Sequence, residues 1–224
     1  MLLANLLAAA FVLLAPIADL VAPTTTPSLP WTAGQKLVYR GTVRYLDTSR
    51  CKDGVCEEAT APIQWTILVR ETEERDGYRL YHLSGFFREL LWIKDKPPAP
   101  KPWIVVVTPS GDVLYAEEPR KAKSLRMKSL VSRGERFFKL PPMEGDPFDC
   151  DRPRTKGKKD CHYCRCILPA SPGRESWVSK WWDNTGEDAY FYDEKRGFVR
   201  FKWEHHGTPS AVDISLVTDP PAQP

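Results

Sequence analysis

The sequence predicts a mainly β protein, in which a curved antiparallel sheet (a half-barrel or a barrel-like meander) packs against one amphipathic helix. Three observations support this fold class. Runs rich in β-branched and aromatic residues recur between residues 36 and 217, and several of them alternate apolar with polar positions. Short turn signals separate these runs. The chain also has eight Trp, eight Tyr and nine Phe among its 224 residues, which is enough aromatic surface for a sizeable core.

The expected strands follow one another closely along the chain. In the second of them Ile63, Trp65, Ile67 and Val69 alternate with polar residues, as in a strand with one buried face. Short antiparallel strands at this spacing form a meander, which must curl over its aromatic face. The predicted strands are 36–46, 63–71 and 78–87, a hairpin at 103–117, and four strands joined by short turns at 176–217.

Residues 119–139 break the strand pattern and predict the helix. Pro119 stands at a helix-start position, and Leu125 and Leu130 would face the sheet in a helix that ends before Gly134. The segment has eight basic residues and one acidic residue, although the net charge of the chain is only +3. Together with the basic loop at 152–159 it would offer a patch to an anionic polymer or membrane surface, and an ordinary solvated helix face is the alternative. No nucleic-acid-binding motif accompanies this charge, so we expect no nucleic-acid partner.

The first residues predict export to the periplasm, the cell envelope or the extracellular space. Residues 2–14 are almost wholly apolar, and small residues follow at Ala18 and Ala22, where a signal peptidase could cut. An uncleaved membrane anchor is the alternative, although the apolar run is short for a span. The expected organisation is a signal peptide at 1–22, a Pro/Thr-rich spacer at 23–34, one β-rich domain at 35–218 with a Cys-rich basic loop at 150–166, and a tail at 219–224.

The cysteines predict disulfides, because their number is even and the expected compartment is oxidising. An Asp-Gly turn between Cys51 and Cys56 favours a local bridge, and the remaining four cysteines allow three pairings. A zinc site on Cys161-x-x-Cys164 with His162, or a redox site, is the alternative. A second Cys-x-x-Cys pair is missing and prolines follow the motif, so we expect neither a metal nor another cofactor. The six cysteines are Cys51, Cys56, Cys150, Cys161, Cys164 and Cys166.

The histidines suggest a second kind of site. Glu204, His205 and His206 end a predicted strand, and with His82 they would form the site of an exported enzyme or metal-binding protein. Adjacent side chains of a strand point to opposite faces, so the simpler interpretation is that the two histidines shape a turn before Thr208. The chain has no Gly-x-Ser-x-Gly, no His-Glu-x-x-His and no phosphate-binding glycine loop. We therefore assign no catalytic residue.

Two stretches carry a resemblance to a known group of proteins. "LVYRGTV" near the start of the domain and "GFVRFKWEHHGTPSAVDISLV" near its end resemble a loose group of uncharacterised exported bacterial β-proteins, similar to the lipoprotein-carrier half-barrels. The resemblance implies a curved antiparallel sheet over a helix that holds something apolar, and it implies no catalytic residues. The Cys-rich insertion at 150–166 departs from that pattern.

The expected function is therefore non-enzymatic binding of a lipid-like or other apolar ligand on the concave face of the sheet. Aromatic side chains on strands supply the apolar surface for such a site, although they are more often simply core. The candidate lining residues are Trp65, Trp103, Trp181 and Trp203.

Overall fold

The computed structural model describes residues 26–145, 148, 162–170 and 176–217. The predicted signal peptide at 1–22, the tail at 219–224, the basic loop at 152–159, Cys150 and Cys161 lie outside the described residues. No helix in the described ranges is long enough and apolar enough to cross a lipid bilayer.

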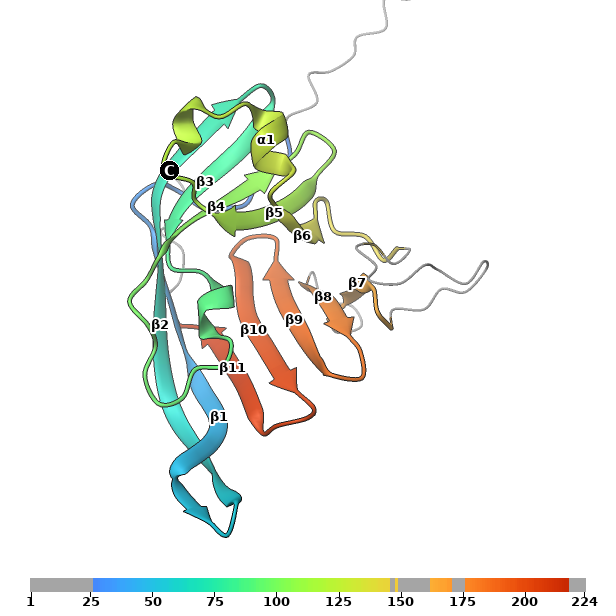
Figure 1. Ribbon diagram of the computed structural model, residues 1–224. Coiled ribbons are helices and arrows are strands. Elements are labelled where there is room, and N and C mark those ends of the chain that lie inside the picture. The colour runs from blue at the N-terminus through green and yellow to red at the C-terminus, as the bar shows by residue number, and fades with distance from the viewer. Residues whose placement is uncertain (1–25, 146–147, 149–161, 171–175, 218–224) are drawn as a thin grey trace, which may run out of the picture.

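The strands of the described chain form one antiparallel sheet that nearly closes into a barrel (Figure 1). The mainly β fold class is therefore confirmed. The order is β6-β5-β4-β3-β2-β1-β11-β10-β9-β8-β7, so the first and last strands pair in the middle of the sheet, and β6 and β7 are its two edges. The eleven strands are β1 (Lys36–Lys52), β2 (Val55–Arg75), β3 (Tyr78–Ser84), β4 (Pro102–Val107), β5 (Asp112–Glu117), β6 (Glu135–Lys139), β7 (Arg165–Pro169), β8 (Ser176–Trp182), β9 (Gly186–Asp193), β10 (Gly197–His205) and β11 (Ser210–Leu216).

The pairing of β1 with β11 joins the two halves of the sheet. Gly41 of β1 lies opposite Ile214 of β11. A Cβ atom at position 41 would lie 1.9 Å from the carbonyl oxygen of Asp213, so only glycine allows the two backbones to approach this closely. On the other side of β1, Tyr39 is directly opposite Trp65 of β2, which places both rings on the inner face.

The interior of the barrel is filled with aromatic side chains. The short helix η1 (Phe87–Leu90), green beside β2 in Figure 1, carries two of them inward. The Phe87 ring stacks on Phe201 with 5.1 Å between the ring centroids, and the Phe86 ring lies 5.7 Å from that of Phe137. The completely buried rings are Tyr39, Phe86, Phe87, Phe137, Phe138, Tyr190, Phe198 and Phe201. This close packing fills the middle of the concave face with the protein's own side chains.

Glu89 fixes η1 in this position. Its carboxylate accepts hydrogen bonds from the backbone N–H of Phe86 (3.0 Å) and of Lys101 (2.9 Å). The same carboxylate accepts a bond from Nε1 of Trp103 on β4 (2.8 Å). Glu89 therefore caps the helix and ties it to the strand that follows.

The helix expected in 119–139 is wrong in its extent. The segment forms two short pieces, η2 (Ala122–Ser124) and α1 (Met127–Val131), and its last residues form strand β6. Leu125 and Arg126 have extended backbones between the two helical pieces. Two adjacent phenylalanines near the end of the segment are completely buried, and pairing of β6 with β5 allows their burial, which a continued surface helix would not.

Candidate functional site

Four of the inward-pointing side chains on β7 to β10 form one row. Arg165 of β7 lies opposite Trp181 of β8, which lies opposite Asp188 of β9, which in turn lies opposite Trp203 of β10. Directly opposed residues of antiparallel strands share a face, so the row lies on the inner surface of the sheet. Trp203 is buried and Trp181 is half-buried. Two of the four predicted tryptophans therefore belong to one surface, with a charged pair beside them.

Arg165 and Asp188 form a bidentate ion pair inside the barrel. Their nitrogen and oxygen atoms are 2.5 and 3.0 Å apart, and the residues are only 3% and 5% exposed. Burial disfavours the charged form of Arg165 and by itself would lower its pKa. Attraction to the Asp188 carboxylate outweighs this effect, so the pKa of the Arg165 guanidinium is raised above its ordinary value. The guanidinium also lies over the Tyr190 ring at 5.4 Å. Arg165 therefore stays charged, and its bidentate bonds to Asp188 hold the polar end of the row in one arrangement.

A second group of polar side chains lies near this pair. Arg88 of η1 lies 3.8 Å from the Glu135 carboxylate on β6, and its guanidinium is 5.9 Å from the Tyr115 ring. Burial raises the pKa of Tyr115 and of Tyr190, so both phenols stay protonated. This end of the interior thus combines two aromatic hydroxyls with charged groups of both signs.

Trp92 covers the other end of the row and is the exposed part of the site. Its ring centroid lies 4.8 Å from that of Trp203 and 4.7 Å from that of His205. We call Trp92, Trp203 and His205 the aromatic rim. Trp92 is 56% exposed and has a left-handed backbone (φ 63°), a conformation that costs a residue other than glycine about 1 to 3 kcal/mol. The contacts of its ring must offset that cost.

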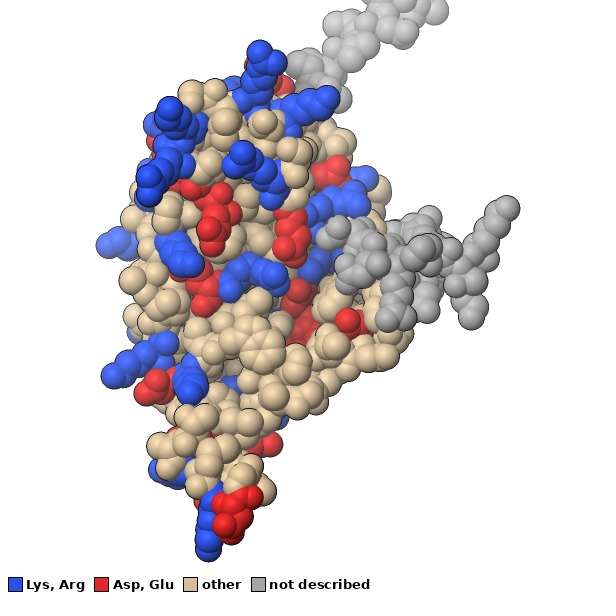
Figure 2. Space-filling view, viewed as in Figure 1, with Lys and Arg blue, Asp and Glu red and all other residues tan. Residues whose placement is uncertain are grey.

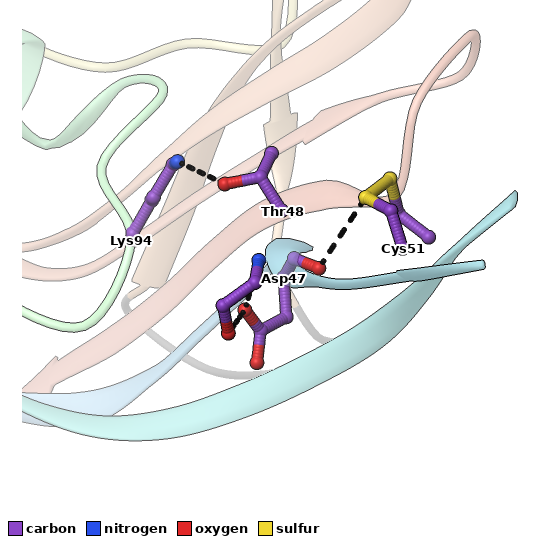
Figure 3. Close-up of a disulfide and its surroundings, with 6 residues drawn as sticks. Asp47, Thr48, Cys51 and Lys94 are labelled. Carbon is purple, nitrogen blue, oxygen red and sulfur yellow. Dashed lines mark hydrogen bonds between the residues drawn. A yellow bond between two sulfur atoms is a disulfide. The ribbon is translucent and has the colours of Figure 1, made fainter. Parts of the chain in front are cut away.

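The loop that carries Trp92 is tied to the β1–β2 hairpin. Nζ of Lys94 donates a hydrogen bond to Oγ1 of Thr48 on β1 (3.4 Å; Figure 3). Figure 2 shows that the surface beside η1 and over the lower ends of β9 and β10 carries few charged side chains.

The structure separates the residues of the predicted Glu204, His205 and His206 site. His205 points to the inner face with Trp203, and its Nδ1 accepts a hydrogen bond from the backbone N–H of Thr208 (3.0 Å). Glu204 points to the outer face, where it pairs with Arg44 at 2.7 Å, and His206 is exposed. Among the described residues, no three His, Cys, Asp or Glu side chains converge as metal ligands would.

His82 is buried in a different place, on the outer side of β3. Its Nδ1 lies 2.6 Å from a Glu118 oxygen, and its Nε2 lies 3.4 Å from a Glu73 oxygen. Glu118 also pairs with Arg70 of β2. Three strands separate β3 from β10 in the sheet, and His82 and His205 share no contact.

The other two predicted tryptophans are part of the packed core. Trp65 and Trp103 are buried, and Trp103 packs against Phe86 with 5.6 Å between the ring centroids. A ligand could reach them only by displacing these neighbours. The surface that remains accessible therefore consists of Trp92, His205 and Trp181, with Trp203 buried beneath Trp92.

Sequence reasoning missed Trp92, Arg165 and Asp188. Asp188 could have been found, because it alternates in phase with the buried rings of Tyr190 and Tyr192 and must therefore point inward. Arg165 follows from Asp188, since a buried carboxylate needs a partner. No periodicity indicates Trp92, which lies in a loop.

The cysteine predictions are confirmed as far as the described residues reach. Cys51 and Cys56 form a disulfide across the end of the β1–β2 hairpin (Figure 3). Cys164 and Cys166 are also disulfide-bonded, and no described cysteine is free. Which cysteine each of these two pairs with stays a prediction, because Cys150 and Cys161 lie outside the described residues.

Comparison with known proteins finds no relative of this chain. No family model, no curated protein and no solved structure matches the chain. The resemblance to exported β-proteins and lipoprotein-carrier half-barrels therefore stays a prediction.

Proposed function

We propose that this protein is an exported, non-enzymatic binding protein that holds a lipid-like or other apolar ligand against the aromatic rim and Trp181. The centre of the concave face is filled by the protein's own rings, so the ligand would lie beside this packed centre, against the exposed ring of Trp92. The disulfides support a place of action outside the reducing cytosol.

The observation that carries this proposal is the exposure of Trp92. An indole ring that is more than half exposed leaves apolar area in water, and here the backbone beneath it is also in a costly conformation. Trp203 and His205 support the ring from below, so its exposed face is held in a fixed position. An exposed apolar surface with this support is typical of a binding site.

The chemistry of the rim favours binding over catalysis. Nδ1 of His205 accepts a hydrogen bond from the Thr208 backbone, which fixes the ring in the turn. Glu204, the nearest carboxylate in the sequence, lies on the opposite face of the strand with Arg44. His205 therefore presents an aromatic face to Trp92 and lacks this carboxylate as a partner for acid–base chemistry.

Titration with a fluorescent fatty acid tests the proposal. We expect Trp92→Ala to weaken retention of the probe roughly tenfold or more, because an exposed ring of this size contributes about 1.5 kcal/mol or more when it is covered. Trp181→Ala should also weaken retention, whereas His205→Gln should weaken it less than Trp92→Ala does, because Gln keeps an acceptor for the Thr208 N–H and only the ring contact with Trp92 is lost.

The matched control for Trp92 is Val55→Ala at the tip of the β1–β2 hairpin. Val55 is 73% exposed and also apolar, but it is distant in the chain from the rim. Equal retention by the wild type, Trp92→Ala and Val55→Ala would show that the rim is not the binding surface.

A further inference from the structure

Residues 119–134, which we call the basic cap, cover the outer face of the sheet at the end where α1 lies (Figure 1). The underside of the cap is apolar. Met127 and Leu130 of α1 are buried against Leu80 of β3 and Ile104 of β4. The cap contains no acidic residue, and its six basic residues are Arg120, Lys121, Lys123, Arg126, Lys128 and Arg133. It is therefore amphipathic, with its apolar side already occupied by the sheet.

Arg75 of β2 fastens the cap to the sheet. Its Nη1 donates hydrogen bonds to the backbone carbonyls of Lys123 (2.9 Å) and Leu125 (3.0 Å). Its Nε lies 2.8 Å from a Glu73 carboxylate oxygen. These bonds satisfy the carbonyls of the cap's turn and keep that turn on the sheet. The position of the cap is thus fixed by the fold.

The charged side chains beneath the cap neutralise one another. Glu73 pairs with Arg75, and Glu118 pairs with Arg70. His82 lies between the two carboxylates and contacts both. This network leaves no excess negative charge beneath the cap to attract its basic side chains.

Most of the basic side chains of the cap have no acidic partner. Lys123 pairs with Glu71 at 2.7 Å. The other five are exposed, and no ion pair with a carboxylate is found for them among the described residues: Arg120, Lys121, Arg126, Lys128 and Arg133. Figure 2 shows Lys and Arg side chains gathered at this end of the molecule.

On the outer face of β8 to β11, in contrast to the cap, the basic side chains have acidic partners. There Arg200 pairs with Asp213 at 2.5 Å, and Lys180 and Lys202 both pair with Glu187 at 2.8 and 3.0 Å. Basic side chains on that face thus alternate with acidic partners, whereas those of the cap do not. The excess positive charge is therefore local, although the net charge of the chain is small.

A hollow lies within the cap at η2. Its volume is about 470 Å³, and its lining includes Arg70, Glu118, Arg120, Lys121 and Lys123. Arg70 pairs with Glu118 and Lys123 pairs with Glu71, so Arg120 and Lys121 supply the positive charge that suits the hollow to an anionic group. The remaining free cations, Arg126 before α1, Lys128 on it and Arg133 after it, extend the positive surface beyond this hollow.

We propose that the basic cap binds the phosphate headgroups of an anionic lipid surface. A single soluble phosphate would engage only the cations around the hollow. A lipid surface presents many headgroups side by side, and it would also engage the cations on and after α1. The proposal concerns the outer face of β2 to β5 and is independent of the aromatic rim.

Co-sedimentation of the full chain with vesicles tests this inference. We expect binding to phosphatidylcholine vesicles that contain phosphatidylglycerol, weaker binding at high salt, and none to phosphatidylcholine alone. The double variant Arg120→Gln/Lys121→Gln should bind about thirtyfold more weakly, from the usual contribution of two basic residues near an anionic membrane.

The matched control is Lys52→Gln/Lys195→Gln, which removes the same charge from two exposed lysines outside the cap. It should bind almost as well as the wild type. An equal loss in both double variants would mean that net charge, and not the cap, attracts the protein. Binding of inorganic phosphate to the free protein, together with no binding to phosphatidylglycerol-containing vesicles, would assign the hollow to a soluble phosphate and overturn the lipid proposal.

Discussion

Tyr39 and Tyr190 are both completely buried on the inner face, but their hydroxyl groups have different surroundings. The Tyr39 hydroxyl donates a hydrogen bond of 2.7 Å to the backbone carbonyl of Phe198. The Tyr190 hydroxyl finds no hydrogen-bond partner among the described residues, and its ring lies under Arg165. Burial raises the pKa of both residues, so neither ionises near neutral pH.

The two tyrosines therefore make a matched pair for mutation to phenylalanine. We expect Tyr39→Phe to lower the free energy of unfolding by about 1 to 3 kcal/mol, because the Phe198 carbonyl loses its side-chain donor in a buried site. Tyr190→Phe keeps the ring beneath Arg165 and breaks no hydrogen bond, so it should change stability by less than about 0.5 kcal/mol. Urea denaturation followed by circular dichroism measures both. Equal losses would mean that the Tyr190 hydroxyl has a partner of its own.

The candidate site shows what can be predicted for single residues. Alternation in the sequence correctly places Trp203 and Trp181 on the inner face, and it would have placed Asp188 there as well. It does not tell which inward side chains remain accessible, because Trp65 and Trp103 are predicted in the same way and are buried in the core cluster. Trp92 depends on a left-handed loop backbone, for which a hydrophobic pattern contains no signal.

Among the elements, the β1–β2 hairpin extends well beyond the core (Figure 1). Side chains from Thr48 to Lys52 of β1 are mostly exposed, and so are most of those at the start of β2. The tip therefore lacks apolar packing, and the Cys51–Cys56 disulfide closes it instead. A two-stranded ribbon without a buried face is marginal by itself in water.

We expect Cys51→Ser/Cys56→Ser to loosen the tip while the barrel persists. Closing so short a loop contributes about 2 kcal/mol on the chain-entropy estimate, and this stabilisation acts on the tip. Hydrogen exchange at residues 48–58 should become much faster, while exchange in β3 and β4 stays slow. Unchanged protection of the tip in the variant would show that the strand pairing alone maintains it.

The strands were easier to predict than the helix for a physical reason. Strand residues such as those of β2 alternate over a long stretch, and one buried face explains the pattern. In 119–139 the apolar residues serve two different surfaces. Met127 and Leu130 cover the outer face of the sheet, whereas Phe137 and Phe138 enter the interior. A single helix could not cover the outer face and also enter the interior, so the segment changes from helix to strand between Leu130 and Phe137.

At the scale of the whole molecule, the barrel depends on contacts between residues distant in the chain. β1 pairs with β11, and the two edges of the sheet, β6 and β7, approach each other to close it. The sequence predicts a curled meander but not this closure, because side-chain alternation gives no information on which edges meet. Sheet edges with unpaired backbone N–H and C=O groups also need protection from pairing with another chain.

Ser179 is the clearest link across this seam. Its hydroxyl, buried on β8, donates a hydrogen bond to the backbone carbonyl of Phe137 on β6 (2.5 Å). Beside it, the backbone of Phe148 exchanges two hydrogen bonds of 2.8 Å with Arg165 of β7, and the Arg136 guanidinium covers the Phe148 ring at 4.6 Å. In the described part of the chain, the seam is thus closed by a few specific contacts and not by a continuous ladder of β6 with β7.

Ser179→Ala should therefore open the seam. The buried Phe137 carbonyl would lose the side-chain donor that it has among the described residues, which costs about 1 to 3 kcal/mol. We expect faster hydrogen exchange in β6 and β7 than in the wild type, with exchange in the β1–β11 pair unchanged. Ser215→Ala is the control, because Ser215 is exposed on β11 and its loss leaves the seam intact. If Ser179→Ala destabilises all strands equally, the seam is not a separate opening unit, and the barrel unfolds only as a whole.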